Sequence, residues 1–230
     1  MSLKDELNED VRAIFATQWE ARDGLVVPEP EDVELGNNGV NLEGTVLYAD
    51  IDGSTAMVDG NKPHFSAEVY KAYLRCAAKV IRSEDGAITA YDGDRVMAVF
   101  IGDHKNTSAV RTALKINYCV RNIINPAIKT QYPSTTFELR QTVGIDTSKL
   151  LVARTGVRGA NDLVWVGRAA NHAAKLTSYS DRSSWITKAV YDVMHGEVKI
   201  SSDGRNMWEA YTWKDMGGIP IYGSNWTWLV

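Results

Sequence analysis

The feature that most constrains this chain is an apolar run that ends in acidic residues, followed by an apolar hairpin with an acidic turn. Residues 45–49 (Thr-Val-Leu-Tyr-Ala) predict a buried strand, and Asp50 follows directly. Residues 87–100 predict a hairpin, because Asp-Gly at 92–93 supplies turn chemistry between two apolar runs, and Asp94 comes next. If the strand pairs beside the hairpin, Asp50 and Asp94 share one edge of a sheet.

Two carboxylates at one sheet edge predict a metal site. Held together they repel, and a hard divalent cation between them removes the repulsion. The backbone N–H groups that follow the first strand form a concave donor surface suited to phosphate; they belong to Asp52, Gly53, Ser54 and Thr55. Together these features indicate nucleotide chemistry. Each signature alone is also typical of an ordinary turn or loop entry, and only their order together with a third motif favours function.

The composition indicates one folded domain with an appendage, or at most two small domains. Of the 230 residues, 44% are hydrophobic, which is enough for a proper core. The formal charge of −4 and the pI near 5.6 argue against nucleic acid or an anionic membrane as a partner. Because no apolar run approaches a bilayer span and the N-terminus is no signal peptide, we expect a cytoplasmic protein without direct membrane association. Cys76 and Cys119 lie in apolar helical patterns, which predicts reduced core residues.

Residues 1–42 predict an N-terminal helix and a linker. Asn8 can cap a helix over residues 9–22. The apolar face of that helix would carry Val11, Ile14, Phe15 and Trp19. Residues 27–31, with two prolines, are expected to be extended, and residues 36–39 (Gly-Asn-Asn-Gly) to form a turn or linker. We expect this arm to pack on its own domain; a dimer strap or a contact for a partner protein is the alternative.

Residues 43–230 alternate strands and helices and predict one catalytic domain. After the first strand, the predicted elements are a helix at 66–83, the hairpin at 87–100, a helix at 106–124, a strand at 137–145 and, beyond a turn at 146–149, an extended run at 150–153. The order β-α-β-β-α-β is that of the ferredoxin-like split βαβ arrangement. The expected fold class is therefore α+β.

A third motif combines a short strand at 162–166 with an alanine-rich helix at 169–176, which Gly167 opens. Asn171 and Lys175 are four residues apart, so they lie on one face of this helix. An amide and an ammonium group aimed the same way can hold a phosphoryl group or a sugar. The alternative is an exposed polar face on a helix that otherwise packs against the core.

Taken in order, these motifs resemble the catalytic domain of class III nucleotidyl cyclases, the fold of adenylate and guanylate cyclases. The matching segments are residues 47–55 for the first metal motif, 91–98 for the Gly-Asp-x-x-Met-Ala hairpin, 143–147 for the Gly-Ile-His-Thr-Gly strand end, and 164–176 for the block that carries the transition-state groups. Asp146 and Ser148 depart from the third motif, where His and Gly are usual. The resemblance runs from about Gly44 to the C-terminus and implies extra C-terminal strands.

The resemblance implies a lyase that uses two divalent cations, Mn²⁺ or Mg²⁺. Asp50, Asp94 and the backbone carbonyl of Ile51 would bind them. The ribose 3′-oxygen would then attack the α-phosphorus, and pyrophosphate would leave. Asn171 would orient the ribose in this reaction, and Lys175 would stabilise charge on the α-phosphate.

The triphosphate-binding side of the implied site contains one departure from the family pattern. Lys175 stands where the family usually has Arg, so a point charge replaces a planar fork of donors. A slower enzyme or an inactive pseudocyclase would follow from that change. Arg158 and Lys214 match the triphosphate clamps of the family more loosely.

The positions that read the base in the family carry no polar side chain in this sequence. They are occupied by Ala90 and Val164. A buried purine edge would remain unpaired there, at a cost of about 1–3 kcal/mol per group. The bulky neighbours Tyr48, Tyr91 and Trp165 are expected to narrow the pocket, and Arg95 is a candidate for base or phosphate contact or else a surface residue.

This combination is similar to the pyrimidine cyclases of bacterial Pycsar anti-phage systems, whose cyclic nucleotide activates a separate effector. A uridylate cyclase is favoured over a cytidylate cyclase. Active sites of the family form between subunits, which implies a homodimer with two equal sites. A purine cyclase and a sensor that binds nucleotide without turnover are the alternatives. A diguanylate cyclase is disfavoured, because a Gly-Gly-Asp-Glu-Phe-like hairpin is absent from the sequence.

Overall fold

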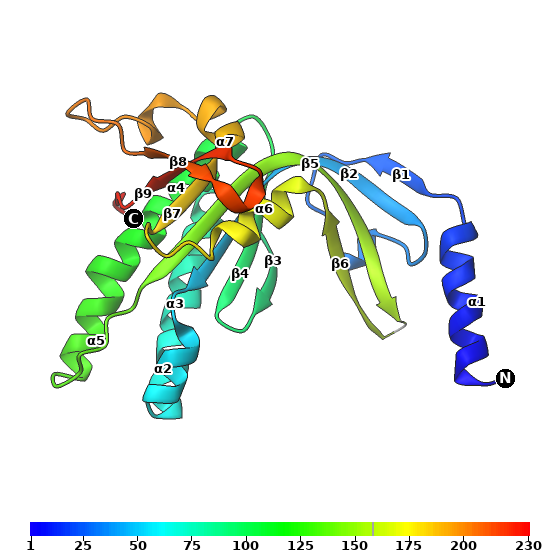
Figure 1. Cartoon of the computed structure of the whole chain (residues 1–230), viewed down its shortest axis with the longest axis horizontal. Helices are drawn as coiled ribbons and strands as arrows, with labels where there is room; N and C mark the ends of the chain where they lie inside the picture. The colour runs from blue at the N-terminus through cyan, green and yellow to red at the C-terminus, as the bar shows by residue number, and fades with distance from the viewer. Residues whose placement is uncertain (158) are drawn as a thin grey trace.

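The structure is a computed structural model that describes residues 1–157 and 159–230. Arg158, one of the two predicted triphosphate clamps, lies outside the described residues. Within them, one sheet has the strand order β3-β4-β2-β5-β7-β9-β8, with β1 paired to β2 and β6 paired to β5 (Figure 1). The strands are β1 (Glu20–Asp23), β2 (Asn38–Ile51), β3 (Ala87–Asp92), β4 (Arg95–Phe100), β5 (Gln141–Val157), β6 (Ala160–Val166), β7 (Ser184–Thr187), β8 (Glu209–Trp213) and β9 (Ile219–Ser224). The helices are α1 (Leu3–Ala16), α2 (Ser54–Gly60), α3 (Pro63–Ser83), α4 (Lys105–Cys119), α5 (Asn125–Gln131), α6 (Arg168–Leu176) and α7 (Lys188–Val193).

The central part of the sheet has the predicted ferredoxin-like order. β2 lies between β4 and β5 and runs antiparallel to both, and α3 and α4 connect the strands in the predicted sequence. The hairpin is also confirmed: Asp92 pairs with Arg95 across a two-residue loop whose first residue, Gly93, has a φ of +61°. Positive φ at the first loop position, and not at the second, is the pattern of a type II′ turn, for which glycine is the favoured residue.

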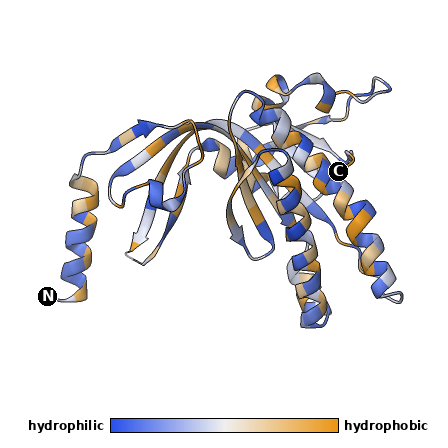
Figure 2. Ribbon diagram, turned by 180° about the vertical axis from the view of Figure 1, so that it is seen from behind, coloured by the Kyte–Doolittle hydropathy of each residue, from blue (hydrophilic) through white to orange (hydrophobic). Residues whose placement is uncertain are grey.

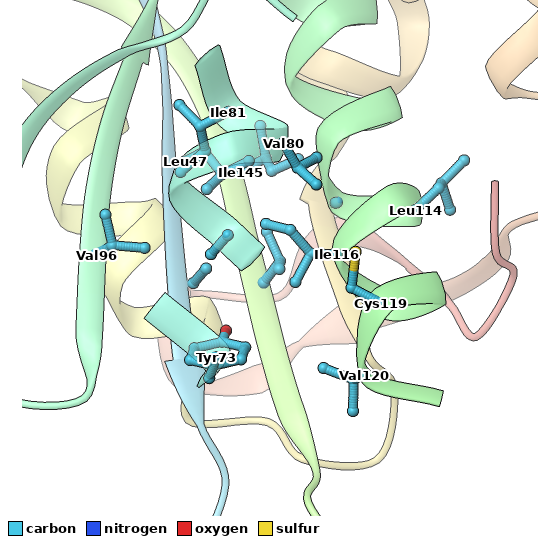
Figure 3. Packing of buried hydrophobic residues seen from close by; sticks show 14 of the residues in the cluster. Leu47, Tyr73, Val80, Ile81, Val96, Leu114, Ile116, Cys119, Val120 and Ile145 are labelled. Carbon is cyan, nitrogen blue, oxygen red and sulfur yellow. The ribbon is translucent and has the colours of Figure 1, made fainter. Parts of the chain in front are cut away.

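Both faces of the central strands are covered, which explains why residues 45–49 read as a continuous apolar run. On one face, the strands pack under α3 and α4; Figure 3 shows Leu47 and Ile145 beside Ile81 of α3, with Leu114 of α4 nearby. Side chains of a strand alternate between the two faces. On the other face, Val46, Met97, Val99, Leu150 and Val152 pack with Ala169, Ala170 and Ala173 of α6.

The C-terminal third adds the predicted extra strands and uses its tryptophans to pack them. A third hydrophobic cluster lies beneath the β8–β9 hairpin and consists of Leu176, Trp185, Trp213 and Ile221. Trp208 belongs to the cluster under α3 and α4, and Trp226 and Trp228 are partly buried against it. The six tryptophans beyond Val164 therefore serve packing. Among the described residues, no helix combines the length and the apolar character that crossing a membrane requires.

The N-terminal helix differs from the predicted one in position and in packing. Ser2, not Asn8, caps α1, because its side chain accepts from the Asp5 backbone while the Asp5 carboxylate accepts from Ser2 in a capping box. The helix ends at Ala16, so Trp19 lies beyond it. No residue of α1 is buried, and Figures 1 and 2 show the helix standing apart from the body of the molecule. The expectation that this arm packs on its own domain is therefore wrong for the single chain.

The predicted linker before the catalytic domain is largely part of the sheet. β1 pairs in parallel with β2, and β2 begins at Asn38 and runs without a break to Ile51. The Gly-Asn-Asn-Gly segment is thus a strand entry, and the boundary expected at residue 42 falls inside a strand. Asn37 explains this outcome, because its amide donates to the carbonyls of Ile14 and Thr17 at 2.8 and 2.7 Å and fixes the end of α1.

The turn predicted at residues 146–149 is also wrong. β5 continues from Gln141 to Val157 and pairs with β2 along thirteen positions, from Gly39 to Ile51. Polar residues in this segment suggested a turn, but they find partners within the fold. The Thr147 hydroxyl, for example, accepts from the Thr45 hydroxyl at 3.1 Å, across the strand pair. Tertiary contacts, invisible to local pattern, keep the strand extended.

Two helical details differ from the expectation. A short helix, α2, directly follows the predicted phosphate loop and precedes α3. The helix expected to end at residue 124 instead passes through a π-helical turn, Val120–Ile124, into α5 despite Pro126. Pro126 is tolerated because it lies at the start of α5, where Pro at the first turn disturbs least.

Candidate active site

The two predicted metal carboxylates lie at one edge of the sheet. Ala49 pairs with Val96, so Asp50, the next residue of β2, lies opposite Arg95, which follows the turn residue Asp94. The strand pairing assumed from the sequence is therefore present. The sheet register, and not a loop, holds Asp50 beside the hairpin that carries Asp94.

Asp50 is engaged with two neighbouring side chains. Arg95 Nη2 donates to Asp50 Oδ2 at 2.7 Å, and the Thr177 hydroxyl, just beyond α6, lies 3.4 Å from the same oxygen. This hydrogen bond to Asp50 raises the pKa of Arg95, with the charge of Asp94 acting in the same direction. The Arg95 guanidinium also lies 5.8 Å from the centre of the Tyr48 ring. Arg95 therefore faces the carboxylates and the Tyr48 ring, and its predicted contact with base or phosphate stays a prediction.

Asp94 has a buried carboxylate oxygen without a partner. Among the described residues, its Oδ2 has no hydrogen-bond partner, and the same holds for the hydroxyl of Tyr73, which projects from α3. Burial raises the pKa of Tyr73 well above its usual value, and the charges of Asp50, Asp52 and Asp94 raise it further. Three carboxylates thus surround one buried phenol. An acceptor left unpaired in this way is costly, and this oxygen is available to a ligand.

The oxygens at this edge fit a hard divalent cation. In the described part of the chain, no three His, Cys, Asp or Glu side chains form a cluster that could hold an ion by themselves. The predicted set is instead two carboxylates, Asp50 and Asp94, with the backbone carbonyl of Ile51 at the end of β2. Carboxylate and carbonyl oxygens are the donors that Mg²⁺ and Mn²⁺ prefer, and Mg²⁺ is usually held by one or two carboxylates plus substrate phosphates.

The predicted phosphate loop, residues 52–55, directly follows β2. Gly53 has φ +68° and caps α2, whose first residues are Ser54 and Thr55. The Asp52 carboxylate accepts from the Thr142 hydroxyl at 2.8 Å, and burial raises its pKa, an effect that Thr142 and Arg140 oppose. The loop is thus fastened to the beginning of β5.

Arg140 is a charged neighbour of this loop that the sequence did not reveal. Its carbonyl accepts from the Asp52 backbone N–H at 3.0 Å, and its guanidinium donates to the Ser180 carbonyl at 3.1 Å. Together with Asp52 and Arg121 it lines a cleft of about 540 Å³. Arg140 lies two residues before Thr142, so the alternation of β5 was the signal that placed it on the same side. That signal required the strand register, because Asp52 and Arg140 are far apart in the chain.

Helix α6 approaches the sheet closely and presents Asn171 and Lys175 to solvent. A Cβ on Gly144 of β5 would lie 2.1 Å from the Ala173 carbonyl, so glycine is required at this crossing. Asn171 is exposed, and Lys175 Nζ lies 3.4 Å from Met216 Sδ in the β8–β9 loop. Among the described residues, no hydrogen bond or ion pair joins either side chain to Asp50 or Asp94. Within one chain, the end of α6 reaches Asp50 through Thr177 and not through Asn171 or Lys175.

The remaining predicted substrate-binding positions divide into exposed and buried ones. Ala90, Tyr91 and Val164 are exposed, and Lys214 is exposed at the start of the turn Lys214–Met216, near the end of the Lys175 side chain. Trp165 does not fit the expectation that it narrows a base pocket. Its side chain is 9% exposed and packs in the cluster beneath α6, because β6 alternates its side chains and Trp165 takes the inward position.

Comparisons with known proteins agree with this geometry. The chain is 52% identical over 231 residues to a uridylate cyclase from Xanthomonas perforans and 52% identical over 232 residues to one from Burkholderia cepacia, and both alignments cover 100% of each chain. The solved structure of the guanylyl cyclase Cya2 matches with a TM-score of 0.69 at 19% identity, over 83% of this chain and 95% of that chain, which shows a shared fold. No protein-family model matches. The predicted class III cyclase fold is confirmed: the chain is a nucleotidyl cyclase and belongs to the family of uridylate cyclases.

Proposed function

We propose that the protein converts UTP to 3′,5′-cyclic UMP and pyrophosphate at sites shared between two copies of the chain. The observation that carries the chemistry is the pair Asp50 and Asp94 at one sheet edge, with a buried oxygen of Asp94 left unpaired. Support for the base comes from the full-length relatives, which are named uridylate cyclases.

In the proposed reaction the side chains of this chain bind and position the substrate. Asp50, Asp94 and the carbonyl of Ile51 would hold two divalent cations, Mn²⁺ or Mg²⁺, and the backbone N–H groups of the loop before α2 would bind phosphate oxygens. When bound, such cations lower the pKa of a ribose hydroxyl and neutralise the triphosphate. The deprotonated 3′-oxygen would then attack the α-phosphorus. The bond between the α-phosphorus and the oxygen that bridges to the β-phosphate would break, and pyrophosphate would leave.

The second half of the site is supplied by a partner copy. Asn171 of the partner subunit orients the ribose, and Lys175 of the partner subunit compensates charge on the α-phosphate. This arrangement is supported by the exposure of both side chains on α6 and by their lack of any contact with the metal carboxylates in one chain. An isologous dimer would then contain two equal sites. Lys214, in the same short turn as the Met216 that Lys175 contacts, is a candidate contact for the triphosphate.

The choice of uracil over a purine follows from what the base-reading positions lack. Ala90 and Val164 offer no side-chain hydrogen bond, so a buried purine edge would lose about 1–3 kcal/mol for each unpaired group. Cytosine remains the second candidate. Uracil and cytosine differ in hydrogen bonding at N3, and neither Ala90 nor Val164 can contact that atom through a side-chain hydrogen bond. The product is proposed to be a second messenger in anti-phage defence that acts on a separate effector.

One experiment tests both the activity and the base. The purified protein is incubated separately with ATP, GTP, CTP and UTP in the presence of Mn²⁺ or Mg²⁺, and pyrophosphate and cyclic product are quantified by mass spectrometry. We expect cyclic UMP from UTP and at most traces from the other three, with no product from Asp50→Asn. Cyclic CMP as the main product would assign a cytidylate cyclase. Binding of nucleotide without pyrophosphate release would contradict catalysis.

A further inference from the structure

Asp146 is a fully buried carboxylate in the middle of β5, on the face that α6 covers. Its side chain is 0% exposed, and it pairs with Val46 in the centre of the sheet. The hydroxyl of Thr187, on β7, donates to Oδ1. A buried charge is costly unless it is paired and hydrogen-bonded. Moving the groups that contact Asp146 away from it would therefore be strongly destabilising.

Two residues of α6 supply the other contacts to Asp146. Arg168 Nε lies 3.1 Å from Oδ2, and His172 Nδ1 lies 3.3 Å from the same oxygen. Burial lowers the pKa of His172, against the opposing charge of Asp146, so the neutral ring adds a contact while Arg168 supplies the compensating charge. The His172 ring also packs edge-on against Trp213 at 5.2 Å.

The first turn of α6 has further attachments to the same strand. Arg168 Nη2 donates to the carbonyl of Thr147 at 2.7 Å, and the Ala169 backbone N–H donates to the Ser148 hydroxyl at 3.0 Å. Gly167, the residue that caps the helix, offers no side chain for this purpose. Capping of α6 is therefore supplied by β5, and the Asp146 carboxylate lies at the centre of the attachment.

These contacts determine which way the exposed side of α6 points. Arg168 and His172 lie four residues apart along one flank of the helix, and Asn171 and Lys175 lie beside them on the exposed side, with Lys175 seven residues after Arg168 and so almost above it. A helix attached at both flanking residues can neither rotate nor slide without breaking the buried ion pair. The orientation of Asn171 and Lys175 is therefore set by the adjoining flank of the same helix.

We propose that Asp146 is a positioning residue for the cyclase reaction: by holding Arg168 and His172 it sets the rotation and axial position of α6, and so aims Asn171 and Lys175 at the substrate. The inference rests on the proposed function for the roles of those two side chains. Misplacement of a catalytic group by about 1 Å can cost about a hundredfold in rate, so a small shift of α6 is enough to be measured.

Glu84 provides a matched control because it is a second buried carboxylate with two cationic partners. Its oxygens lie 3.0 Å from Arg111 Nη1 and 2.8 Å from Lys115 Nζ, at the end of α3. Both partners belong to α4, and none of these groups contacts α6. Glu84→Gln therefore removes a comparable buried ion pair without touching the proposed positioning device.

The first test compares Asp146→Asn with Glu84→Gln in amide hydrogen exchange, which needs no substrate. We expect the amides of α6 to exchange at least tenfold faster in Asp146→Asn and to be unchanged in Glu84→Gln. If Asp146→Asn does not fold, Arg168→Gln replaces it, because the Arg168 side chain is 49% exposed and its loss leaves Asp146 bonded to Thr187. Unchanged exchange in α6 would overturn the inference whether or not the enzyme is active.

The second test uses steady-state kinetics with UTP and Mn²⁺. We expect kcat to fall about ten- to hundredfold in Asp146→Asn, with KM changed less than about threefold, and both constants to stay within about twofold of wild type in Glu84→Gln. Combining Asp146→Asn with Lys175→Ala should lower kcat by less than the product of the single effects, because the part of the Asp146→Asn effect that acts through Lys175 is already lost when Lys175 is removed. Full multiplicativity, or a wild-type kcat in Asp146→Asn, would overturn the inference. An inactive wild-type protein would instead contradict the proposed function and leave the exchange result decisive for α6.

Discussion

Asp94 illustrates, at the scale of single residues, how a functional site differs from a packed interior. Most buried polar atoms in folded proteins have a hydrogen-bond partner, yet Asp94 Oδ2 and the Tyr73 hydroxyl have none. The nearby Asp50 is paired with Arg95 at 2.7 Å. Grouped carboxylates repel one another, and the proposed cations would remove that repulsion.

Asp94→Asn should remove the response of the protein to divalent cations. We expect the Tm of the wild-type protein to rise with Mn²⁺ concentration, since a ligand that binds only the native state stabilises it, and the Tm of Asp94→Asn to stay constant. Without metal, the variant should melt at or above the wild-type temperature, because it relieves repulsion with Asp50. Differential scanning calorimetry measures both. Asp103→Asn, at an exposed acid after β4, serves as control, and a persistent Mn²⁺ effect in Asp94→Asn would count against the metal site.

The two cysteines predict a measurable difference in thiol reactivity. A hydrogen bond with Cys119 lowers the pKa of Cys76 to about 7, whereas the same contact and burial raise the pKa of Cys119. Because the thiolate is the nucleophile, alkylation of Cys76 by iodoacetamide should slow as the pH falls through 7, and Cys119 should stay unmodified. Peptide mass spectrometry over pH 5–9, at about half-unit steps, follows both sites. In Cys119→Ala, which removes the hydrogen-bond donor, the profile of Cys76 should move to higher pH; an identical profile in both proteins would refute the coupling.

The role of a residue could be predicted where the residues that determine it are close in the sequence. It was missed where those residues are remote in the sequence. Asp50 and Asp94 follow strand and turn signals that lie within a few positions of each, so their placement at one edge could be inferred. Tyr73 lay in a predicted helix and Arg140 in the strand predicted at 137–145, and neither was assigned to the site, because their acidic neighbours are remote in the chain. Asp146 read as a turn residue for the same reason: Thr187 and Arg168, its partners, come later.

At the scale of elements, α6 depends on the absence of a side chain beneath it. The closest approach of this helix to β5 is at Gly144, where an added Cβ would meet the Ala173 carbonyl at 2.1 Å and the Leu176 Cβ at 2.8 Å. The neighbouring atoms are helix backbone and a buried side chain, which cannot yield easily. The helix would therefore have to move as a body.

Gly144→Ala should lower both stability and turnover. Overpacking of this kind costs about 1–3 kcal/mol of unfolding free energy, and displacement of α6 would carry Asn171 away from the substrate. Urea unfolding measures the first effect and cyclic-nucleotide formation the second. Gly196→Ala is the control, because a Cβ there meets nothing within 4 Å. Wild-type turnover in Gly144→Ala would show that the position of α6 tolerates this change.

The elements predicted correctly are those whose packing shows in the spacing of their own apolar residues. α3 and the β3–β4 hairpin appear as expected, because one has an apolar stripe at helical spacing and the other an Asp-Gly turn between apolar runs. α1 was misplaced because two candidate caps, Ser2 and Asn8, compete and only the capping box with Asp5 distinguishes them. β5 was broken in two because its polar middle is satisfied by distant elements.

At the scale of the whole molecule, the proposed shared site predicts that two copies of the chain act together. Asp50 and Asp94 lie at the hairpin edge, whereas Asn171 and Lys175 face solvent from α6. The overall fold followed from the order of motifs. The pairing of copies was inferred only from the resemblance to the cyclase family and stays a prediction, because the surfaces of an interface leave no local pattern in the sequence of one chain.

A mixture of two inactive variants tests the shared site. Asp50→Ala and Asn171→Ala are each expected to be inactive, but a heterodimer of the two contains one site with both residues intact. After complete subunit exchange at equal amounts, about one quarter of the wild-type rate should return, because half of the dimers are mixed and each has one of two sites restored. Asp50→Ala mixed with Asp94→Ala is the control and should stay inactive. Absence of recovery after proven exchange would contradict a site built from two copies.

The length of β5 has a consequence for how the molecule comes apart. This one strand passes through both hydrophobic clusters that cover the sheet, contributing Val143 and Ile145 to one and Leu150 and Val152 to the other. Neither layer can melt while the other keeps β5 in place, so the catalytic body is expected to denature in a single cooperative transition. A cation bound at the Asp50 edge would thereby protect residues on the far side of the protein as well.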